Sequence, residues 1–167
     1  MLRLTETRNL KDPRFLGLYR SSFPLDEQIP PSELSNLLGK GGKLLLATDS
    51  DVFVGFAFVF ENKGALYIAY LAVTPSLRGE GYGSDILESI VNDSNHSGYI
   101  LSIECADYDD PSGTRTARRR FYEKNGWRRS SLRILTKGID LDIYTIDSNL
   151  SDDEILDTIR SFYGNMS

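Results

Sequence analysis

Cysteine and histidine are almost absent from this chain of 167 residues, which contains one of each, Cys105 and His96. One cysteine excludes a framework of intrachain disulfides and any cysteine-rich zinc site. One histidine disfavours histidine-based metal sites and leaves a single candidate for a Ser-His-Asp triad. We therefore expect no metal. Cys105 is interpreted as a small buried residue, and His96 as an exposed loop residue because serine, asparagine and glycine surround it.

Long apolar runs are missing as well. No stretch approaches the ~20 apolar residues that a membrane-spanning helix requires. The segment MLRLTETRNLKDPR lacks the apolar core of a signal peptide. The sequence therefore predicts a cytoplasmic protein without a membrane partner.

Positive charge is in deficit, with 19 Lys and Arg residues against 24 Asp and Glu residues and a net charge of −5. This balance disfavours general binding to nucleic acid, which requires a basic face. It suits a cationic small-molecule partner. The apolar share of 40% and the charged share of 26% are ordinary for a globular chain. The length predicts one domain that spans residues 1–167.

Patterns typical of strands and helices alternate along the chain, which predicts a layered α/β (α+β) fold. Strands are expected at residues 2–5, 43–48, 52–61, 65–73, 99–105, 127–136 and 139–146. Helices are expected from Asp12-Pro13 onward, at 32–38, after the glycine-rich segment that follows Pro75, at 114–125 and at 151–163. The strand at 52–61 is apolar on both faces, which places it in the middle of a sheet. Alternation puts five of its residues on one face: Val52, Val54, Phe56, Phe58 and Phe60.

The last expected helix, 151–163, begins with Ser151 and has Glu154 three residues later, the spacing of a capping box. Its apolar residues recur on one face. The helix therefore either covers the sheet of its own chain or forms a homodimer contact.

A glycine-rich segment, Arg78-Gly-Glu-Gly-Tyr-Gly-Ser84, links an expected strand to an expected helix. Glycine permits positive φ and lets amide groups face a ligand with no Cβ in the way. The free N–H groups of the first helical turn add a partial positive charge, so this junction predicts a phosphate site. It is no Walker loop, because no Gly-Lys pair precedes Ser or Thr. It is no dinucleotide fingerprint either, because both reading frames lack the third glycine or alanine.

The pattern [Q/R]-x-x-G-x-[G/A], here Arg78 to Gly83, resembles the pyrophosphate loop of the GNAT superfamily of acetyl-CoA-dependent N-acetyltransferases. The preceding LAVTP and the later RRRFYEKNGW, about 40 residues on, resemble further segments of that family in the same order. The resemblance covers residues 43–146. It implies the single-domain GNAT fold: a mixed, mostly antiparallel sheet of about seven strands, helices on both faces, and a splayed parallel strand pair at the cofactor site.

The resemblance also implies acetyl-CoA as co-substrate. The pantetheine arm is expected against the backbone of Leu71, Ala72 and Val73. The pyrophosphate is expected on the amides of Arg78, Gly79, Gly81, Tyr82, Gly83 and Ser84. Tyr122 matches a family tyrosine that protonates the departing thiolate, a task suited to a phenol. The alternative for Tyr122 is a core tyrosine beside Phe121.

The general base is not defined by the resemblance, because the family's fourth-strand glutamate has no counterpart in YIAYLAV. The nearest acid is Glu104, which is either the base or amine anchor, or part of a structural ion pair. In the loop 23–31, Asp26 and Glu27 either attract a cationic amine or belong to an acidic surface loop. Aromatic walls for the acceptor are expected from Tyr67, Tyr70 and Tyr108.

The activity implied is transfer of an acetyl group to a primary amine of a small molecule or peptide by direct attack in a ternary complex. A non-catalytic acyl-CoA-binding or regulatory module is the alternative, since the fourth strand has no acid. A nucleic-acid or protein-interaction module built on RRRFYEKNGWRR is opposed by the net acidity. Eight basic residues predict a basic flank for an anionic cofactor: Arg115, Arg118, Arg119, Arg120, Lys124, Arg128, Arg129 and Arg133.

Overall fold

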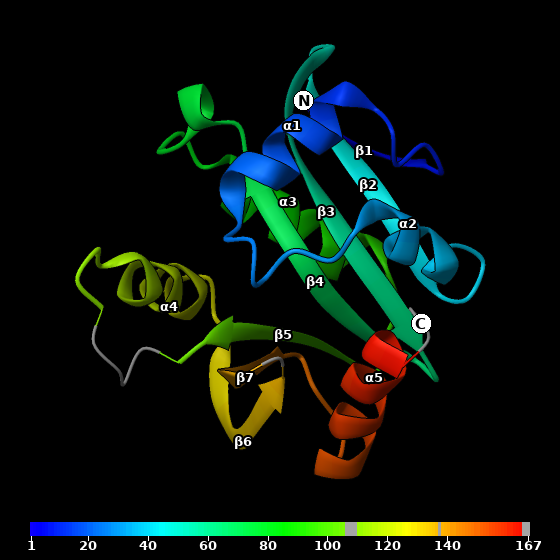
Figure 1. The fold of residues 1–167 in the computed structure, drawn as a ribbon, viewed down its shortest axis with the longest axis vertical. Helices are drawn as coiled ribbons and strands as arrows, with labels where there is room; N and C mark the ends of the chain where they lie inside the picture. Colours follow the sequence, from blue (N-terminus) through cyan, green and yellow to red (C-terminus); the bar gives the residue numbers. More distant parts are fainter. Residues whose placement is uncertain (106–109, 137, 165–167) are drawn as a thin grey trace.

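A seven-stranded mixed sheet forms the centre of the molecule (Figure 1). The structure is a computed structural model that describes residues 1–105, 110–136 and 138–164. In chain order the strands are β1 (Leu2–Thr7), β2 (Gly42–Asp49), β3 (Val52–Asn62), β4 (Ala65–Val73), β5 (Gly98–Glu104), β6 (Arg128–Thr136) and β7 (Ile139–Ile146). The helices are α1 (Pro13–Ser22), α2 (Pro31–Leu34), α3 (Tyr82–Asp93), α4 (Thr114–Lys124) and α5 (Asp152–Gly164), with 3-10 turns η1 (Ser35–Leu37) and η2 (Pro75–Leu77).

The strands lie in the order β1-β2-β3-β4-β5-β7-β6, and β4 and β5 form the one parallel pair among them. Their pairing joins only Ala65–Ile68 to Gly98–Leu101. Beyond this point β4 continues to Val73 and β5 to Glu104. The two strands therefore separate at their carboxyl ends, which confirms the expected splayed pair.

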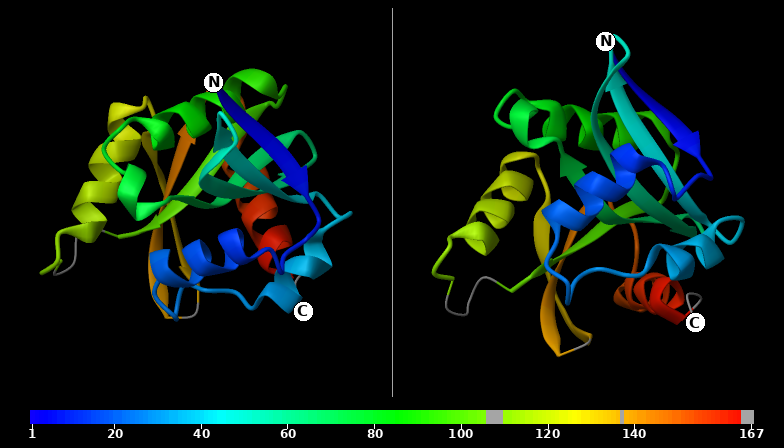
Figure 2. Two further views of the ribbon diagram at one scale, coloured as in Figure 1. Left: turned by 90° about the horizontal axis from the view of Figure 1, so that it is seen from above. Right: turned by 45° about the horizontal axis from the view of Figure 1, so that its top comes forward.

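Helices cover both faces of the sheet (Figure 2). Helices α1, α2 and α5 bury Phe15, Leu34 and Ile159 in one apolar layer. Helix α3 buries Ile86 in the other layer, together with Trp127. Both layers form because β3 and β4 are apolar on both faces, so the sheet has to be covered twice.

Helix α5 packs on the sheet of its own chain, where Ile155 and Phe162 are 4% and 1% exposed. The expected capping box is present. The Glu154 amide donates to the Ser151 hydroxyl at 3.2 Å, and the Ser151 amide donates to the Glu154 carboxylate at 3.0 Å. This reciprocal pair fixes the residue at which α5 begins.

A β-bulge in β3 breaks the strict alternation of its side chains. Ala47 of β2 faces Gly55, whereas the next residue of β2, Thr48, faces Phe53. Val54 is therefore the extra residue, and it is buried in the layer of α3 rather than in the layer of Phe56. The prediction that Val54 shares a face with Phe56 is wrong, because an inserted residue reverses the alternation.

A second bulge lies in β4. Phe58 faces Tyr70 and Val59 faces Ile68, which leaves Ala69 without a partner on β3. Tyr67 and Tyr70 consequently lie in the same apolar layer although they are three positions apart in the chain. A bulge bends its strand, and this one begins where the pairing of β4 with β5 ends.

We expect Gly55→Ala to destabilise the protein by about 1–3 kcal/mol, the usual cost of overpacking. A Cβ at Gly55 would overlap the carbonyl oxygen of Ala72 and lie 3.2 Å from the Cα of Val73. Gly17→Ala is the control: its Cβ meets nothing within 4 Å in α1, so stability should be unchanged or higher. Urea unfolding of both variants measures the difference, and equal stabilities would contradict the prediction.

Candidate active site

A groove of about 660 Å³ extends from the carboxyl end of β4 to the N-termini of α3 and α4. Every residue assigned to the cofactor from the sequence lines it: Leu71, Ala72, Val73, Arg78, Gly79, Gly81, Tyr82, Gly83 and Ser84. Gly79 and Gly81 have φ values of 83° and 88°, and a Cβ on either would meet nothing within 4 Å. The backbone therefore turns into α3 in a conformation that favours glycine and leaves the groove open.

Gly83 has a different structural role. It lies within α3, and a Cβ at this position would come to 3.0 Å from the ring of Phe121. Its small size lets α3 approach α4 closely. The close approach places Tyr82 and Phe121 on the same groove.

Two side-chain hydrogen bonds hold the glycine-rich turn, and one of them involves a residue outside the predicted set. The hydroxyl of Tyr82 donates to the Asp49 carboxylate at 2.7 Å. The Arg78 guanidinium donates to the Val73 carbonyl at 3.0 Å. Sequence reasoning missed Asp49, because it ends β2, far from the turn in the chain.

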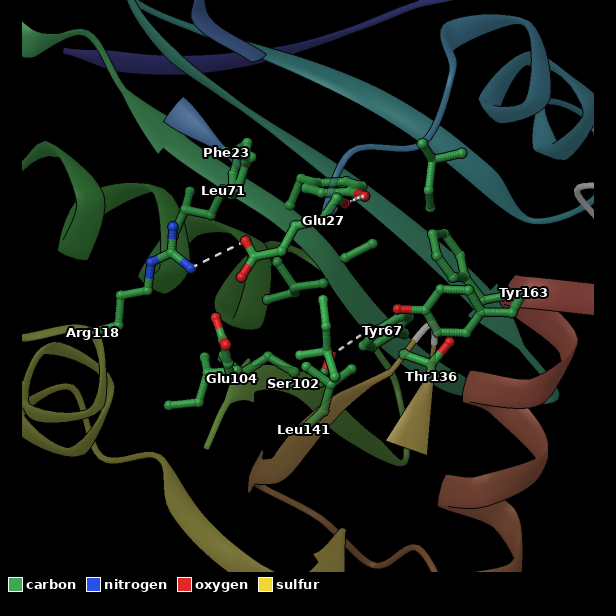
Figure 3. Close-up of a pocket in the computed structure, with 18 of the residues that line it drawn as sticks. Phe23, Glu27, Tyr67, Leu71, Ser102, Glu104, Arg118, Thr136, Leu141 and Tyr163 are labelled. Atoms are coloured by element: carbon green, nitrogen blue, oxygen red, sulfur yellow. Dashed lines mark hydrogen bonds and ion pairs between the residues drawn. The ribbon is translucent and has the colours of Figure 1, made fainter. Parts of the chain in front are cut away.

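A smaller cavity of about 100 Å³ lies between the separating ends of β4 and β5 (Figure 3). The predicted catalytic residues Glu104 and Tyr122 line it, as do the predicted acceptor residues Asp26, Glu27 and Tyr70. The groove and this cavity share four residues: Phe23, Leu71, Arg118 and Tyr122. The two spaces therefore meet at Tyr122.

The Tyr122 phenol remains protonated at neutral pH. Burial raises its pKa to about 12, although the nearby Arg118 opposes the shift. The ring packs against Phe121 at 5.1 Å and Trp127 at 6.4 Å between centroids. This packing confirms the core-tyrosine interpretation and holds a phenol where the two spaces meet, whereas the role of Tyr122 at the cofactor stays a prediction.

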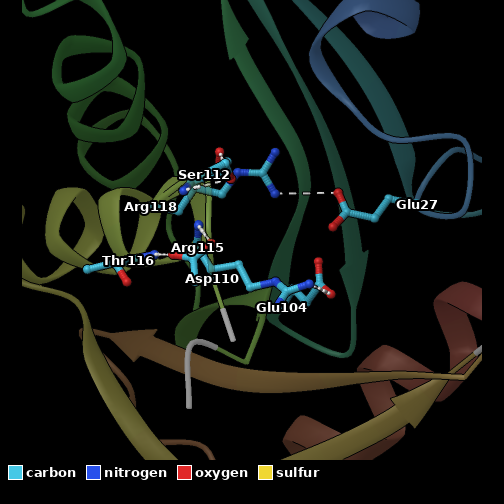
Figure 4. Close-up of polar contacts among 8 residues, drawn as sticks. Glu27, Glu104, Asp110, Ser112, Arg115, Thr116 and Arg118 are labelled. Carbon is cyan, nitrogen blue, oxygen red and sulfur yellow. Dashed lines mark hydrogen bonds and ion pairs between the residues drawn. The ribbon is translucent and has the colours of Figure 1, made fainter. Parts of the chain in front are cut away.

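Two ion pairs lie side by side at the cavity, which Glu27, Glu104 and Arg118 line (Figure 4). Arg115 and Glu104 form an ion pair of 2.7 Å, whereas Arg118 and Glu27 lie 3.4 Å apart. Burial raises the pKa of Glu27; Arg118 opposes the shift and Glu104 adds to it. Glu104 thus takes part in the ion pair that the sequence left as an alternative, and Glu27 is the carboxyl group whose pKa burial raises.

Asp110 caps the helix that carries both arginines. Its carboxylate accepts hydrogen bonds from the amides of Thr116 at 3.0 Å and Arg115 at 3.4 Å. These bonds lower the pKa of Asp110 and satisfy free amides at the start of α4. The sequence carries a signal for this contact, an aspartate shortly before a helix.

Tyr70 holds the loop 23–31 in place as well as lining the cavity. Its hydroxyl donates to the Glu27 carbonyl at 2.6 Å, and its ring packs edge-on against Phe23 at 4.9 Å. Burial raises its pKa, so the phenol stays neutral. Asp26 lines the cavity but is exposed. Tyr108 lies outside the described residues.

The basic stretch 115–133 is not one cofactor-facing flank. Only Arg118 and Lys124 of the eight line the groove. Arg129 and Arg133 lie 3.8 and 3.0 Å from the Asp142 carboxylate on β7. The predicted basic flank for the cofactor is therefore confined to Arg118 and Lys124, and the Asp142 carboxylate pairs with part of the remaining charge.

The position of His96 also corrects an expectation. Its side chain is only 11% exposed, packs edge-on against Tyr99, and lies 3.4 Å from the Glu61 carboxylate. Cys105 is fully buried, as expected.

Within residues 1–105, 110–136 and 138–164, no group of three or more His, Cys, Asp or Glu residues is placed to hold a metal. Over the same residues, none of the helices is both long and apolar enough for a membrane span.

Residues 40–129, more than half of the chain, match the model of the acetyltransferase (GNAT) domain. Taken with the fold and the two meeting spaces, this match defines the class of protein. The chain belongs to the GNAT acetyltransferase family.

Solved structures show the same fold. A GNAT-family protein from Bacteroides thetaiotaomicron matches with a TM-score of 0.74 and 19% identity, covering 96% of this chain and 93% of its own. An Arabidopsis thaliana protein was solved with a bisubstrate analogue that joins CoA to a peptide. It matches with a TM-score of 0.65 and 18% identity, covering 87% of this chain and 97% of its own. A spermidine N-acetyltransferase variant from Vibrio cholerae matches with a TM-score of 0.63 and 16% identity, covering 87% of this chain and 92% of its own. No curated protein sequence matches this chain significantly.

Proposed function

We propose that this protein is an N-acetyltransferase that transfers the acetyl group of acetyl-CoA to a primary amine by direct attack within a ternary complex. One observation carries the proposal: a groove that fits the cofactor and a separate cavity for the acceptor meet at Tyr122. A ternary mechanism requires this arrangement, because both substrates must reach one point together. We also propose that the protein acts in the cytoplasm, without nucleic-acid or membrane partners.

The described residues fit acetyl-CoA along the whole groove. The pantetheine arm would follow the backbone of Leu71–Val73, and the pyrophosphate would lie on the amides between Gly79 and Ser84 at the start of α3. The thioester would then lie near Tyr122. The similarity to a protein solved with a CoA-containing bisubstrate analogue supports this placement.

The chain's own residues supply both proton transfers of the proposed reaction. The amine nitrogen attacks the thioester carbonyl and loses a proton to the Glu27 carboxylate. Collapse of the tetrahedral intermediate breaks the carbon–sulfur bond, and Tyr122 gives its proton to the departing thiolate. Glu27 is preferred over Glu104 as proton acceptor because Arg115 holds Glu104 at 2.7 Å.

Two measurements test the proposal. Calorimetry with acetyl-CoA detects the cofactor site, and release of free thiol in the presence of a panel of primary amines detects transfer. Absence of acetyl-CoA binding at millimolar concentration would refute the proposal. Binding without turnover of any amine would instead favour the non-catalytic acyl-CoA-binding module.

We expect Gly81→Ala to weaken acetyl-CoA binding by about tenfold, because misplacing one amide of the phosphate site loses a hydrogen bond to a charged group. Alanine is strained at a φ of 88°. Gly39→Ala is the matched control, since Gly39 has a φ of 82° and its Cβ would meet only Arg8, at 3.8 Å. Both variants should lose similar stability in thermal denaturation. Calorimetry should show weaker binding for Gly81→Ala alone, and equal affinities would contradict the assignment.

A further inference from the structure

The acceptor cavity has an uncharged polar end that the proposed chemistry does not use. Glu27, Glu104 and Arg118 lie on one side of it, and Tyr67 and Tyr163 on the other (Figure 3). The hydroxyls of Tyr67 and Ser102 are hydrogen-bonded at 2.6 Å across the separating strands. The cavity therefore offers an acid end next to Tyr122 and a hydroxyl end away from it.

Tyr163 comes from α5, which lies outside the segment that matches the family model. Its ring packs edge-on against Phe162 at 5.0 Å, and Phe162 in turn packs against Tyr67 at 5.2 Å. Phe162 is 1% exposed, so this aromatic contact anchors the end of α5 against β4. Tyr163 is half-buried and its side chain lines the cavity.

The hydroxyl end stays neutral at physiological pH. Burial raises the pKa of Tyr163, although the neighbouring Tyr67 hydroxyl opposes the shift. Burial also raises the pKa of Tyr67 well above that of a free phenol. The carboxylate whose charge reaches Tyr163 is that of Glu27, which is assigned to the reacting amine, so a second ammonium group at this end would lose its water without a carboxylate of its own. A hydroxyl or amide group would find hydrogen-bonding partners there.

The size of the cavity restricts the acceptor further. Its volume of about 100 Å³ is well below the roughly 300–1,000 Å³ of pockets for drug-sized ligands. An acceptor enclosed between Glu27 and Tyr163 is therefore a small molecule. It reaches both ends of the cavity with a short chain.

We propose that the acceptor is a small primary amine whose far end carries an uncharged hydroxyl or carboxamide group, and that Tyr163 selects it through its phenol. The inference rests on the proposed acetyl transfer. It assigns the amine to the Glu27 end and the neutral oxygen to the Tyr163, Tyr67 and Ser102 end. A diamine or polyamine is disfavoured, in contrast to the substrate named for the Vibrio cholerae neighbour.

The test compares amino alcohols of two to five carbons with the alkylamines and diamines of equal chain length. Thiol release gives kcat/KM, and thermal denaturation in the presence of CoA gives binding independently of turnover. We expect the best amino alcohol to exceed its alkylamine and diamine by about five- to tenfold in kcat/KM, the effect of one neutral hydrogen bond. Preference for the diamine, or equal values for all three, would overturn the inference.

Tyr163→Phe separates selection from folding, because it keeps the ring that packs on Phe162 and removes only the hydroxyl. We expect it to lower kcat/KM for the amino alcohol about fivefold and to leave the alkylamine unchanged. Tyr99→Phe is the matched control, since the Tyr99 hydroxyl bonds to Ser94 and to the Val91 carbonyl, away from the cavity. An equal loss for both amines with Tyr163→Phe would show a merely structural role and overturn the inference.

Failure of the proposed function would be recognised separately. No thiol release with any amine would refute acetyl transfer. In that case the thermal measurements still test the site. Greater stabilisation of the protein by amino alcohols than by alkylamines, with the difference lost in Tyr163→Phe, supports the assigned site. Equal stabilisation by the two kinds of amine overturns the assignment.

Discussion

Tyr122→Phe should lower kcat for acetyl transfer by about 100-fold and leave the KM for acetyl-CoA nearly unchanged. General acid catalysis contributes roughly 10²–10⁴-fold, and phenylalanine retains the packing on Phe121 and Trp127 while removing the proton. Burial raises the pKa of Tyr122 to about 12, so the phenol holds its proton throughout the usual assay range. Steady-state kinetics by thiol release measures the effect.

Tyr144→Phe is a suitable control for the loss of kcat, because Tyr144 is fully buried in the layer of α3 and lines neither space. It should retain the kcat of the parent protein. An unchanged kcat in Tyr122→Phe would remove the general-acid role. A rise in KM alone would indicate that Tyr122 only contacts the cofactor.

Glu27→Gln should lower kcat/KM for the amine by about 100-fold and change the pH profile. A base acts only when deprotonated, so activity falls as pH falls through the native pKa of Glu27. Burial raises this pKa, which moves the acidic limb of the profile to higher pH than an exposed glutamate would give. Protonation of the amine substrate lowers activity in both proteins, so kcat/KM is expressed per concentration of neutral amine. On that basis the variant should lack the acidic limb that Glu27 contributes.

Glu104→Gln distinguishes the two carboxylates of the cavity wall. We expect a smaller loss from it and retention of the acidic limb, because Arg115 already engages Glu104 at 2.7 Å. Glu33→Gln, on the exposed side of α2, serves as the neutral reference. A larger loss from Glu104→Gln than from Glu27→Gln would assign the proton acceptor to Glu104.

The cofactor groove could be predicted from the sequence because its recognition elements are local. Positive φ at Gly79 and Gly81, and the amides at the start of α3, follow from the spacing of glycines between a strand and a helix. The acceptor cavity could not be predicted in the same way. Glu27 and Arg118 are 91 positions apart, and no local pattern indicates that they pair.

The bulges show a second limit of sequence reasoning. Alternation along β3 predicts one face for Val54 and Phe56, and a single inserted residue reverses it. Gly55 was the available signal, since glycine inside a strand marks a bulge or a close approach of backbone. Ala69 in β4 gives no such signal, and its bulge depends on the register set by β3. Net charge does not predict which charged residues pair, so nothing in the sequence indicates that Asp142 lies beside Arg129 and Arg133.

The early end of the β4–β5 pairing leaves the sheet with an internal edge. Within the described residues, Tyr70–Val73 of β4 has a strand neighbour on the β3 side alone. Such an edge is a template for any extended chain with amide groups. Under the proposed function the pantetheine arm is that chain, so the cofactor acts as the missing strand and its binding completes the fold. A ligand that binds only the folded state stabilises it by mass action, and the protein should be most resistant to unfolding when its substrate is abundant.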